Sequence, residues 1–178
     1  MKRIDAEGAD PARPRKANAA SISLFDIFPR HIAEALRDGR PVKAEQKDCV
    51  TIFFSDIVGF TMVSSELPPQ KVASLLDRLY TKLDKLWETH DVFKVETIGD
   101  AYMAVSNIVK DQKDDHCKRI AEFTIEAILA ANETYIDLEE KGNGCVNIRV
   151  GFHAGPVVAD VSLSAYPWFV RLASVDQN

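Results

Sequence analysis

The sequence predicts an α+β fold, a ferredoxin-like (palm-type) sandwich with an antiparallel sheet and helices on one face. Three observations predict it. Short β-branched and aromatic runs alternate with two long amphipathic segments, a two-residue Gly-Asp link joins two of these runs, and the elements follow in the order strand, helix, strand, strand, helix, strand, strand. Helices of this length between strands cover one face of a sheet.

The chain begins with a tail, a connector and a first strand. Residues 1–20 combine charged residues with prolines and small side chains and have almost nothing to bury, so we expect a disordered tail. Residues 21–47 form a connector with a predicted short helix at residues 31–37. The run at residues 49–56 is typical of a strand covered on both faces, and a tight turn is expected at Gly59.

The middle of the chain predicts two helices and a hairpin. Pro68-Pro69 opens a helix in which apolar side chains recur every three or four residues as far as Trp87. Two short strands at residues 92–98 and 101–106 flank a Gly-Asp link that is typical of a tight hairpin. A second amphipathic helix is expected over residues 114–138.

The C-terminal part predicts two further strands. Apolar and polar residues alternate from Val146 to His153, which indicates a half-buried strand. We expect Gly155-Pro156 to turn the chain into a short strand at residues 157–161. Residues 162–178 show no clear period, so the predicted parts are a tail (1–20), a connector (21–47), a main domain (48–161) and a divergent tail (162–178).

Composition excludes several classes of function. The 22 basic and 27 acidic residues give a net charge of −5, which argues against a nucleic-acid surface built from bulk positive charge. Three cysteines without a CxxC pair indicate a reducing compartment rather than a disulfide framework. No apolar run approaches the roughly 18 residues that a spanning helix needs, so we expect a cytoplasmic chain, or the cytosolic part of a membrane-anchored parent.

Two carboxylates stand at the ends of predicted strands. Asp56 closes the first strand, and Asp100 lies at the tip of the hairpin. If these elements pair, the carboxylates meet at one sheet edge and suit Mg²⁺, and two ions about 3.5–4 Å apart can clamp both oxygens of a phosphoryl transfer. The residues leave a structural alternative open, in which Asp56 caps the next turn and Asp100 is an ordinary hairpin residue.

The residues around both carboxylates resemble those of a known family. Residues 50–61 (VTIFFSDIVGFT) and 93–103 (FKVETIGDAYM) closely resemble the two signature segments of the class III nucleotidyl cyclase catalytic domain. Residues 148–159 (IRVGFHAGPVVA) resemble a third segment, and residues 28–42 are similar to the connector that precedes this domain in eukaryotic guanylate cyclases. The resemblance covers about residues 24–161.

The resemblance implies an enzyme of the guanylate cyclase type, which converts GTP to cyclic GMP and pyrophosphate by two-metal phosphoryl transfer in cyclic nucleotide signalling. Asp56 and Asp100 match the family's catalytic, metal-binding aspartates, and the Ile57 carbonyl matches a further ligand of one of two Mg²⁺ or Mn²⁺ ions. The backbone that follows is expected to hold the triphosphate of the substrate, at Gly59, Phe60 and Thr61.

Glu96 is expected to select the base. Guanine offers two hydrogen-bond donors to a carboxylate, whereas adenine presents a lone pair at N1, and an acceptor that faces another acceptor is left unpaired. Because adenylate members of the family typically carry Lys at the matching position, Glu96 favours GTP. Two alternatives remain: an adenylate cyclase with relaxed base choice, and a structural Glu96 opposite Lys94 or another charge.

The resemblance stops near Val161. The family continues with a glycine where this chain has Asp160, and then with an Asn and an Arg that stabilise the transition state, which residues 162–178 do not supply. Because the family acts as head-to-tail dimers, we expect a homodimer, or a heterodimer with another cyclase domain, with no nucleic acid and no membrane contact by this segment. The resemblance also implies a sheet that is incomplete at the C-terminus, and an isolated chain that is inactive. The alternative function is therefore a binding and dimerisation module that pairs with a full cyclase.

Overall fold

The computed structural model describes residues 28, 30–162 and 169–174. The expected disordered tail at residues 1–20, and most of residues 162–178, lie outside this part. The chain divides into two compact units, residues 1–41 and 42–178. In the first unit, the structure describes α2 (Arg30–Arg37), which confirms the predicted short helix.

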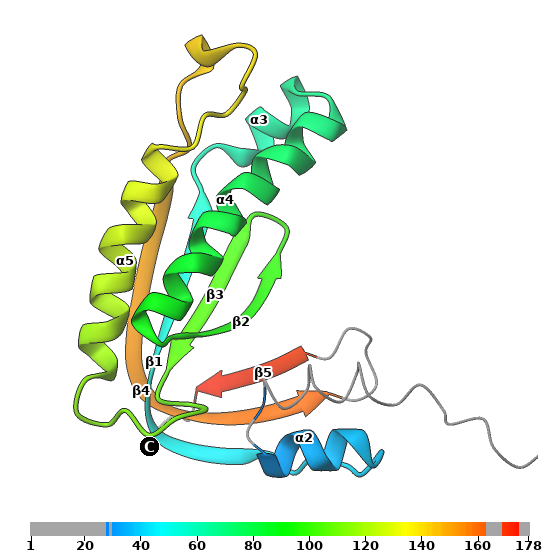
Figure 1. Ribbon diagram of the computed structural model, residues 1–178, viewed down its shortest axis with the longest axis vertical. Helices are drawn as coiled ribbons and strands as arrows, with labels where there is room; N and C mark the ends of the chain where they lie inside the picture. The colour runs from blue at the N-terminus through cyan, green and yellow to red at the C-terminus, as the bar shows by residue number, and fades with distance from the viewer. Residues whose placement is uncertain (1–27, 29, 163–168, 175–178) are drawn as a thin grey trace, which may run out of the picture. The chain divides into compact units, whose positions relative to one another are not determined.

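The second unit contains a five-stranded antiparallel sheet (Figure 1). The strand order is β2-β3-β1-β4-β5, so β1 lies at the centre between β3 and β4. The strands are β1 (Glu45–Ile57), β2 (Phe93–Ile98), β3 (Ala101–Ser106), β4 (Ile148–Ser162) and β5 (Phe169–Ser174). The order of the first four strands, with a helix after β1 and another after β3, is that of the predicted ferredoxin-like fold.

Two helices cover one face of this sheet, which we call the helix face. They are α4 (Pro69–His90) and α5 (His116–Asn132), and the edge of the Phe123 ring packs on Phe53 with centroids 5.0 Å apart. The core between sheet and helices includes Phe53, Ile57, Tyr102 and Ala104 from the strands and Leu75, Leu79, Leu83, Ile120 and Ala127 from the helices. No helix within the described ranges is long and apolar enough to span a bilayer.

The opposite face, which we call the open face, is covered only in part. A small cluster of Val50, Val105 and Val157 is buried there, but Phe54 on the same face of β1 is 51% exposed. The expectation that residues 49–56 form a strand covered on both faces is therefore wrong for the single chain. The exposed part of the open face leaves room for a substrate or a partner.

A bulge in β2 controls which residues reach the open face. Lys94 lies opposite Ala104, Glu96 lies opposite Met103, and the register shifts between them at Val95. Directly opposed residues of antiparallel strands project to the same face. Lys94 therefore projects to the helix face, where it bonds to Asp84, and Glu96 projects to the open face. If Val95 were instead paired in regular register, without the bulge, both side chains would share one face.

The strand β4 corrects the prediction of a turn at Gly155-Pro156. The strand runs unbroken through both residues, because its pairing with β1 shifts register between Lys47 and Val50, opposite this dipeptide. Proline has no backbone N–H to donate to a neighbouring strand. A bulge interrupts the regular hydrogen bonding between strands, so a residue opposite it does not need that donor. The sequence marked Gly155 and Pro156 as unusual residues for a strand, but it did not predict that a long strand would accommodate them.

Three further elements differ from the sequence prediction. The expected turn at Gly59 leads directly into a short helix, α3 (Phe60–Glu66). The helix α5 ends at Asn132 rather than near residue 138, and its cap leads to a loop that contains the single 3₁₀ turn of the described residues, η1 (Lys141–Asn143). The strand β5 pairs with the end of β4, within a stretch for which no period was found.

Candidate functional site

The structure brings Asp56 and Asp100 together at one end of the sheet. Asp56 is the penultimate residue of β1, and Asp100 occupies the two-residue turn between β2 and β3, as the Gly-Asp link predicted. Gly99 adopts a φ of +62°, which only glycine reaches easily, so the turn depends on it. The backbone N–H of Ile57 donates to Oδ2 of Asp100 at 3.2 Å, which fixes the hairpin tip against the end of β1.

The two carboxyl groups interact with each other, and their pKa values shift in opposite directions. Partial burial and the hydrogen bond with Asp56 raise the pKa of Asp100 above 3.8. Hydrogen bonds from Asp100 and from Arg149 hold the pKa of Asp56 below the same value. Two adjacent carboxylates cannot both ionise without a compensating charge, so the pair has the character of a cation site.

Arg149 supplies a positive charge at this site, and sequence reasoning did not assign it a role. It lies directly opposite Asp56 in the β1–β4 pairing, and its Nε donates to Oδ2 of Asp56 at 2.9 Å, with a second bond from its terminal nitrogen. The guanidinium remains 75% exposed. The pKa of Arg149 is raised by this contact with Asp56. The sequence does not reveal that Arg149 lies beside Asp56, because this depends on the register between β1 and β4, which are distant in the chain.

Tyr80 is a second residue that sequence reasoning placed only in a helix. Its hydroxyl donates to the carbonyl of Gly99 at 2.8 Å, so α4 holds the turn that carries Asp100. Burial, followed by the charges of Asp100 and Asp56, raises the pKa of Tyr80 to about 12. The hydroxyl therefore keeps its proton and remains a donor at neutral pH.

The backbone after β1 offers further donors. Gly59 has a φ of +73° and precedes α3, whose first intrahelical bonds run from Met62 and Val63 to the carbonyl of Gly59. The N–H groups at the start of a helix have no intrahelical acceptor, and here they belong to Phe60 and Thr61. The ring of Phe60 packs against the main core, and Thr61 is exposed.

Glu96 lies on the same open face as Asp56. Both residues project to the side of Phe54 and Met103, by alternation along β1 and by cross-strand pairing in β2. Lys94 instead bonds to both oxygens of Asp84 at 2.8 Å, so it does not neutralise Glu96. Within residues 30–160, Glu96 makes no ion pair.

An open cavity of about 420 Å³ lies beside the carboxylate pair on the open face. It is lined by Phe54, Ser55, Asp56, Ala101, Arg149, Val150 and Gly151. Across the part of the chain that the structure describes, no three His, Cys, Asp or Glu side chains converge on a metal position. The donor set at this cavity is instead two carboxylates and the backbone of Ile57, which suits a hard cation that takes its remaining ligands from phosphate oxygens and water.

Comparison with known proteins gives consistent similarities. The model of the adenylate and guanylate cyclase catalytic domain matches residues 42–169. The receptor-type guanylate cyclase gcy-28 of Caenorhabditis elegans is 42% identical over 144 residues, which are 81% of this chain but 11% of that protein. This chain therefore spans a small part of the length of the curated relatives that it matches.

Two solved structures are similar in fold and sequence. The guanylate cyclase domain of RhGC from Catenaria anguillulae, solved in complex with GTP, is 32% identical with a TM-score of 0.66 over 74% of this chain and 69% of that chain. A dimeric guanylyl cyclase domain of the RhoGC fusion protein from Blastocladiella emersonii is 31% identical with a TM-score of 0.65 over 74% of this chain and 70% of that chain. The chain belongs to the adenylate and guanylate cyclase catalytic domain family.

Proposed function

We propose that this chain is a guanylate cyclase-type catalytic domain that converts GTP to cyclic GMP and pyrophosphate. The observation that carries the proposal is the interacting pair of Asp56 and Asp100, which the bond from Ile57 holds together at the end of β1, on the face that also bears Glu96. The pair offers a position for divalent cations, and Glu96 offers acceptors to a purine on the same side of the sheet. Similarity to a cyclase domain solved with GTP supports the choice of substrate.

Asp56 and Asp100 would hold two Mg²⁺ or Mn²⁺ ions, with the carbonyl of Ile57 as a further ligand. Such ions lower the pKa of the ribose 3′-hydroxyl and stabilise the departing pyrophosphate. The protein's part is to keep both carboxylates ionised and oriented. Ile57 and the turn at Gly99 fix Asp100, and β1 fixes Asp56.

Arg149 and the start of α3 would bind the triphosphate. When cations neutralise Asp56, the guanidinium of Arg149 is free to bond phosphate oxygens, which it contacts well because of its planar fork. The N–H groups of Gly59, Phe60 and Thr61 add donors at the end of β1. The triphosphate is thereby held between a guanidinium and a run of backbone amides.

Glu96 would discriminate guanine from adenine. Its carboxylate accepts from N1–H and the 2-amino group of guanine, and faces a lone pair in adenine. The competing structural role, in which Glu96 pairs with Lys94, is not favoured because Lys94 bonds to Asp84. Glu96→Lys is therefore expected to lower the preference for GTP over ATP, measured as the ratio of kcat/KM values in a competent dimer.

A second cyclase domain would complete the site. The run at residues 49–56 has the composition of a strand buried on both faces, yet Phe54 is 51% exposed and Ile98 is 66% exposed. A partner on the open face would bury these side chains. Similarity to a cyclase domain solved as a non-canonical dimer supports dimerisation but does not bear on which face is used. The three free cysteines and a nucleotide substrate fit a cytosolic location.

The test is cyclic GMP formation from Mn²⁺-GTP, by the chain alone and in a mixture with a complete cyclase domain. We expect product in the mixture, and its loss with Asp56→Ala or Asp100→Ala. Asp111→Ala is the matched control, because Asp111 is an exposed aspartate in a loop at the other end of the sheet. Activity that survives both site substitutions contradicts the assignment. Co-purification with the partner but no product in any mixture indicates a binding module instead.

A further inference from the structure

A second cluster of reactive side chains lies on the helix face, away from Asp56. Cys49 in β1 places its sulfur 3.3 Å from Nε2 of His116, the first residue of α5. The other ring nitrogen, Nδ1, lies 2.7 Å from Oγ1 of Thr51. A thiol, an imidazole and a group that orients the imidazole are the parts of an activated nucleophile.

The hydrogen bonds of this cluster are all satisfied in the tautomer of His116 that carries its proton on Nδ1. Nδ1 of His116 donates to Oγ1 of Thr51, and the Thr51 hydroxyl donates to Sγ of Cys117, 3.2 Å away. Nε2 of His116 then presents its lone pair to the thiol of Cys49. In this tautomer, His116 can accept a proton from Cys49 and not from Cys117.

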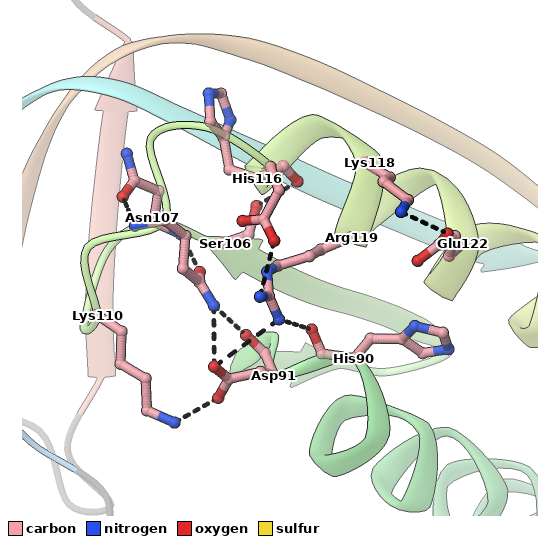
Figure 2. A network of polar contacts seen from close by, with 11 residues as sticks. His90, Asp91, Ser106, Asn107, Lys110, His116, Lys118, Arg119 and Glu122 are labelled. Carbon is pink, nitrogen blue, oxygen red and sulfur yellow. Dashed lines mark hydrogen bonds and ion pairs between the residues drawn. The ribbon is translucent and has the colours of Figure 1, made fainter.

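The surrounding structure holds both partners in place. The carbonyl of His116 accepts a hydrogen bond from Ser106 at 2.9 Å, and its side chain is buried with 7% exposure. Figure 2 shows that the ring of His116 points away from the ion pairs of Asp91 and Arg119, which brace the start of α5. The imidazole therefore has a fixed direction.

Cys49 is held through its backbone. Its carbonyl accepts from Nδ2 of Asn107 at 2.6 Å, and the Asn107 side chain also accepts from the N–H of Gln112. Gln112 in turn donates to the carbonyl of Asp91 at 2.7 Å. The loop between β3 and α5 thus fixes the strand at the residue that carries the thiol.

The thiol is accessible from solvent. Cys49 is exposed and lines an open cavity of about 450 Å³. The other lining residues come from the start of β1 and from the loop before α5: Gln46, Lys47, Asp48, Asn107, Ile108, Val109, Lys110, Asp111 and Lys113. A small oxidant therefore reaches the sulfur without any rearrangement of the core.

We propose that Cys49 is an oxidation site, with His116 as its base and hydrogen peroxide as the oxidant. The thiol gives its proton to Nε2 of His116, and the sulfur attacks one peroxide oxygen. An S–O bond forms as the O–O bond breaks, and the leaving hydroxide takes the proton from His116 to give water. The sulfur is oxidised by two electrons to a sulfenic acid, and the peroxide is reduced.

The two other cysteines are internal references. Cys117 is also exposed, but Nδ1 beside it lies 3.5 Å away and is bonded to Thr51. Cys145 is less exposed, and no described histidine contacts its sulfur. A free thiol with a pKa near 8.5 is about 3% ionised at pH 7, so activation can raise its rate by at most about 30-fold.

The experiment treats the reduced full chain with hydrogen peroxide in the presence of dimedone, and follows the three cysteine peptides by mass spectrometry. We expect Cys49 to be trapped at least about 5-fold faster than Cys117 and Cys145. In concentrated urea the three rates should converge, because the contact with His116 is lost. Equal rates in the folded chain, or a faster Cys117, overturn the proposal.

Two variants distinguish the loss of His116 as a base from a general effect of replacing a histidine. His116→Gln should lower the rate at Cys49 to that at Cys145, whereas His153→Gln, at an exposed histidine of β4, should leave it unchanged. A folded His116→Gln chain with an undiminished rate at Cys49 contradicts the role of the imidazole. If that variant does not fold, the comparison of native and urea rates decides the outcome.

Discussion

Arg149 and Asp56 face each other across β4 and β1, and the guanidinium bonds to the carboxylate that the proposed cations require. The carboxylate of Asp56 cannot fully bind the guanidinium and a cation at the same time. In the proposed function, the arginine would therefore compete with a cation in the nucleotide-free protein and would contact the substrate once the cation is bound.

Replacing Arg149 is expected to change two affinities in opposite directions. Arg149→Met should tighten Mn²⁺ binding without nucleotide by only a few-fold, because the exposed guanidinium competes weakly with the cation for Asp56. The KM for GTP in the mixed dimer should rise, because a phosphate contact is lost. Calorimetric Mn²⁺ titration and cyclase kinetics measure the two effects. A variant in which both affinities fall would show that Arg149 only supports the fold.

Tyr80 is expected to act as a positioning residue for Asp100. Tyr80→Phe keeps the ring, whose centroid lies 5.7 Å from that of Tyr102, and removes the bond to Gly99. The loss should cost about 0.5–1.5 kcal/mol in the free energy of unfolding and weaken Mn²⁺ binding several-fold.

The control for Tyr80 is Tyr102→Phe, which removes a hydrogen bond of the same length to Asp84 on the helix face. This variant should lose stability without a change in Mn²⁺ affinity. Equal Mn²⁺ affinity in wild type and Tyr80→Phe, measured well below both melting temperatures, argues against a positioning role.

Asp100→Asn is expected to stabilise the protein in the absence of metal. The substitution removes a charge that opposes Asp56, while an amide oxygen still accepts from the N–H of Ile57. The gain should be about 1 kcal/mol, or about 2–4 °C in Tm, because like charges in a largely hydrated site repel each other only weakly. In Mn²⁺ the order should reverse, because only the wild type gains binding energy. Melting curves with chelator and with Mn²⁺ provide the measurement.

Asp137 is expected to make stability depend on acid pH. The hydrogen bond from Lys71 at 2.7 Å, followed by the N–H of Glu139, lowers the pKa of Asp137 below 3.8. A lowered pKa means that the stabilisation is present above pH 3.8 and is lost as the pH falls through the lowered value. Asp137→Asn should therefore be less stable than wild type at neutral pH, and the difference should shrink in acid. Denaturant unfolding at several pH values tests this, with Asp111→Asn as the exposed control.

Short sequence patterns predicted the hairpin and the long helix α4, because these elements depend mainly on residues that are close together in the chain. The Gly99-Asp100 link identified the hairpin because glycine alone reaches the required φ easily, and the spacing of leucines identified α4. The order of these elements then limited the topology to few choices. The proximity of Asp56 and Asp100 follows from that topology, which is why the sequence could predict it.

Features that depend on register could not be predicted in this way. Arg149 meets Asp56 only because β4 pairs with β1 in one alignment, and Pro156 stays within β4 only because a bulge lies opposite. The helix α3 has no buried residue, so it lacks the apolar period that reveals longer helices. For Arg149 and Pro156, the interaction that matters joins strands that are distant in sequence. For α3, the sequence carries no apolar period that would reveal a helix.

The single extra residue at Val95 has a consequence for how base preference could change over evolution. If β2 kept all its residues but lost the bulge, so that Val95 paired with Met103, Glu96 would turn to the helix face and its carboxylate would no longer face a purine, although its identity would be unaltered. Base preference in the proposed cyclase would then depend on strand register as well as on side-chain chemistry. A glutamate introduced at the matching position of a related strand that lacks the bulge would project to the helix face and would not reach the base.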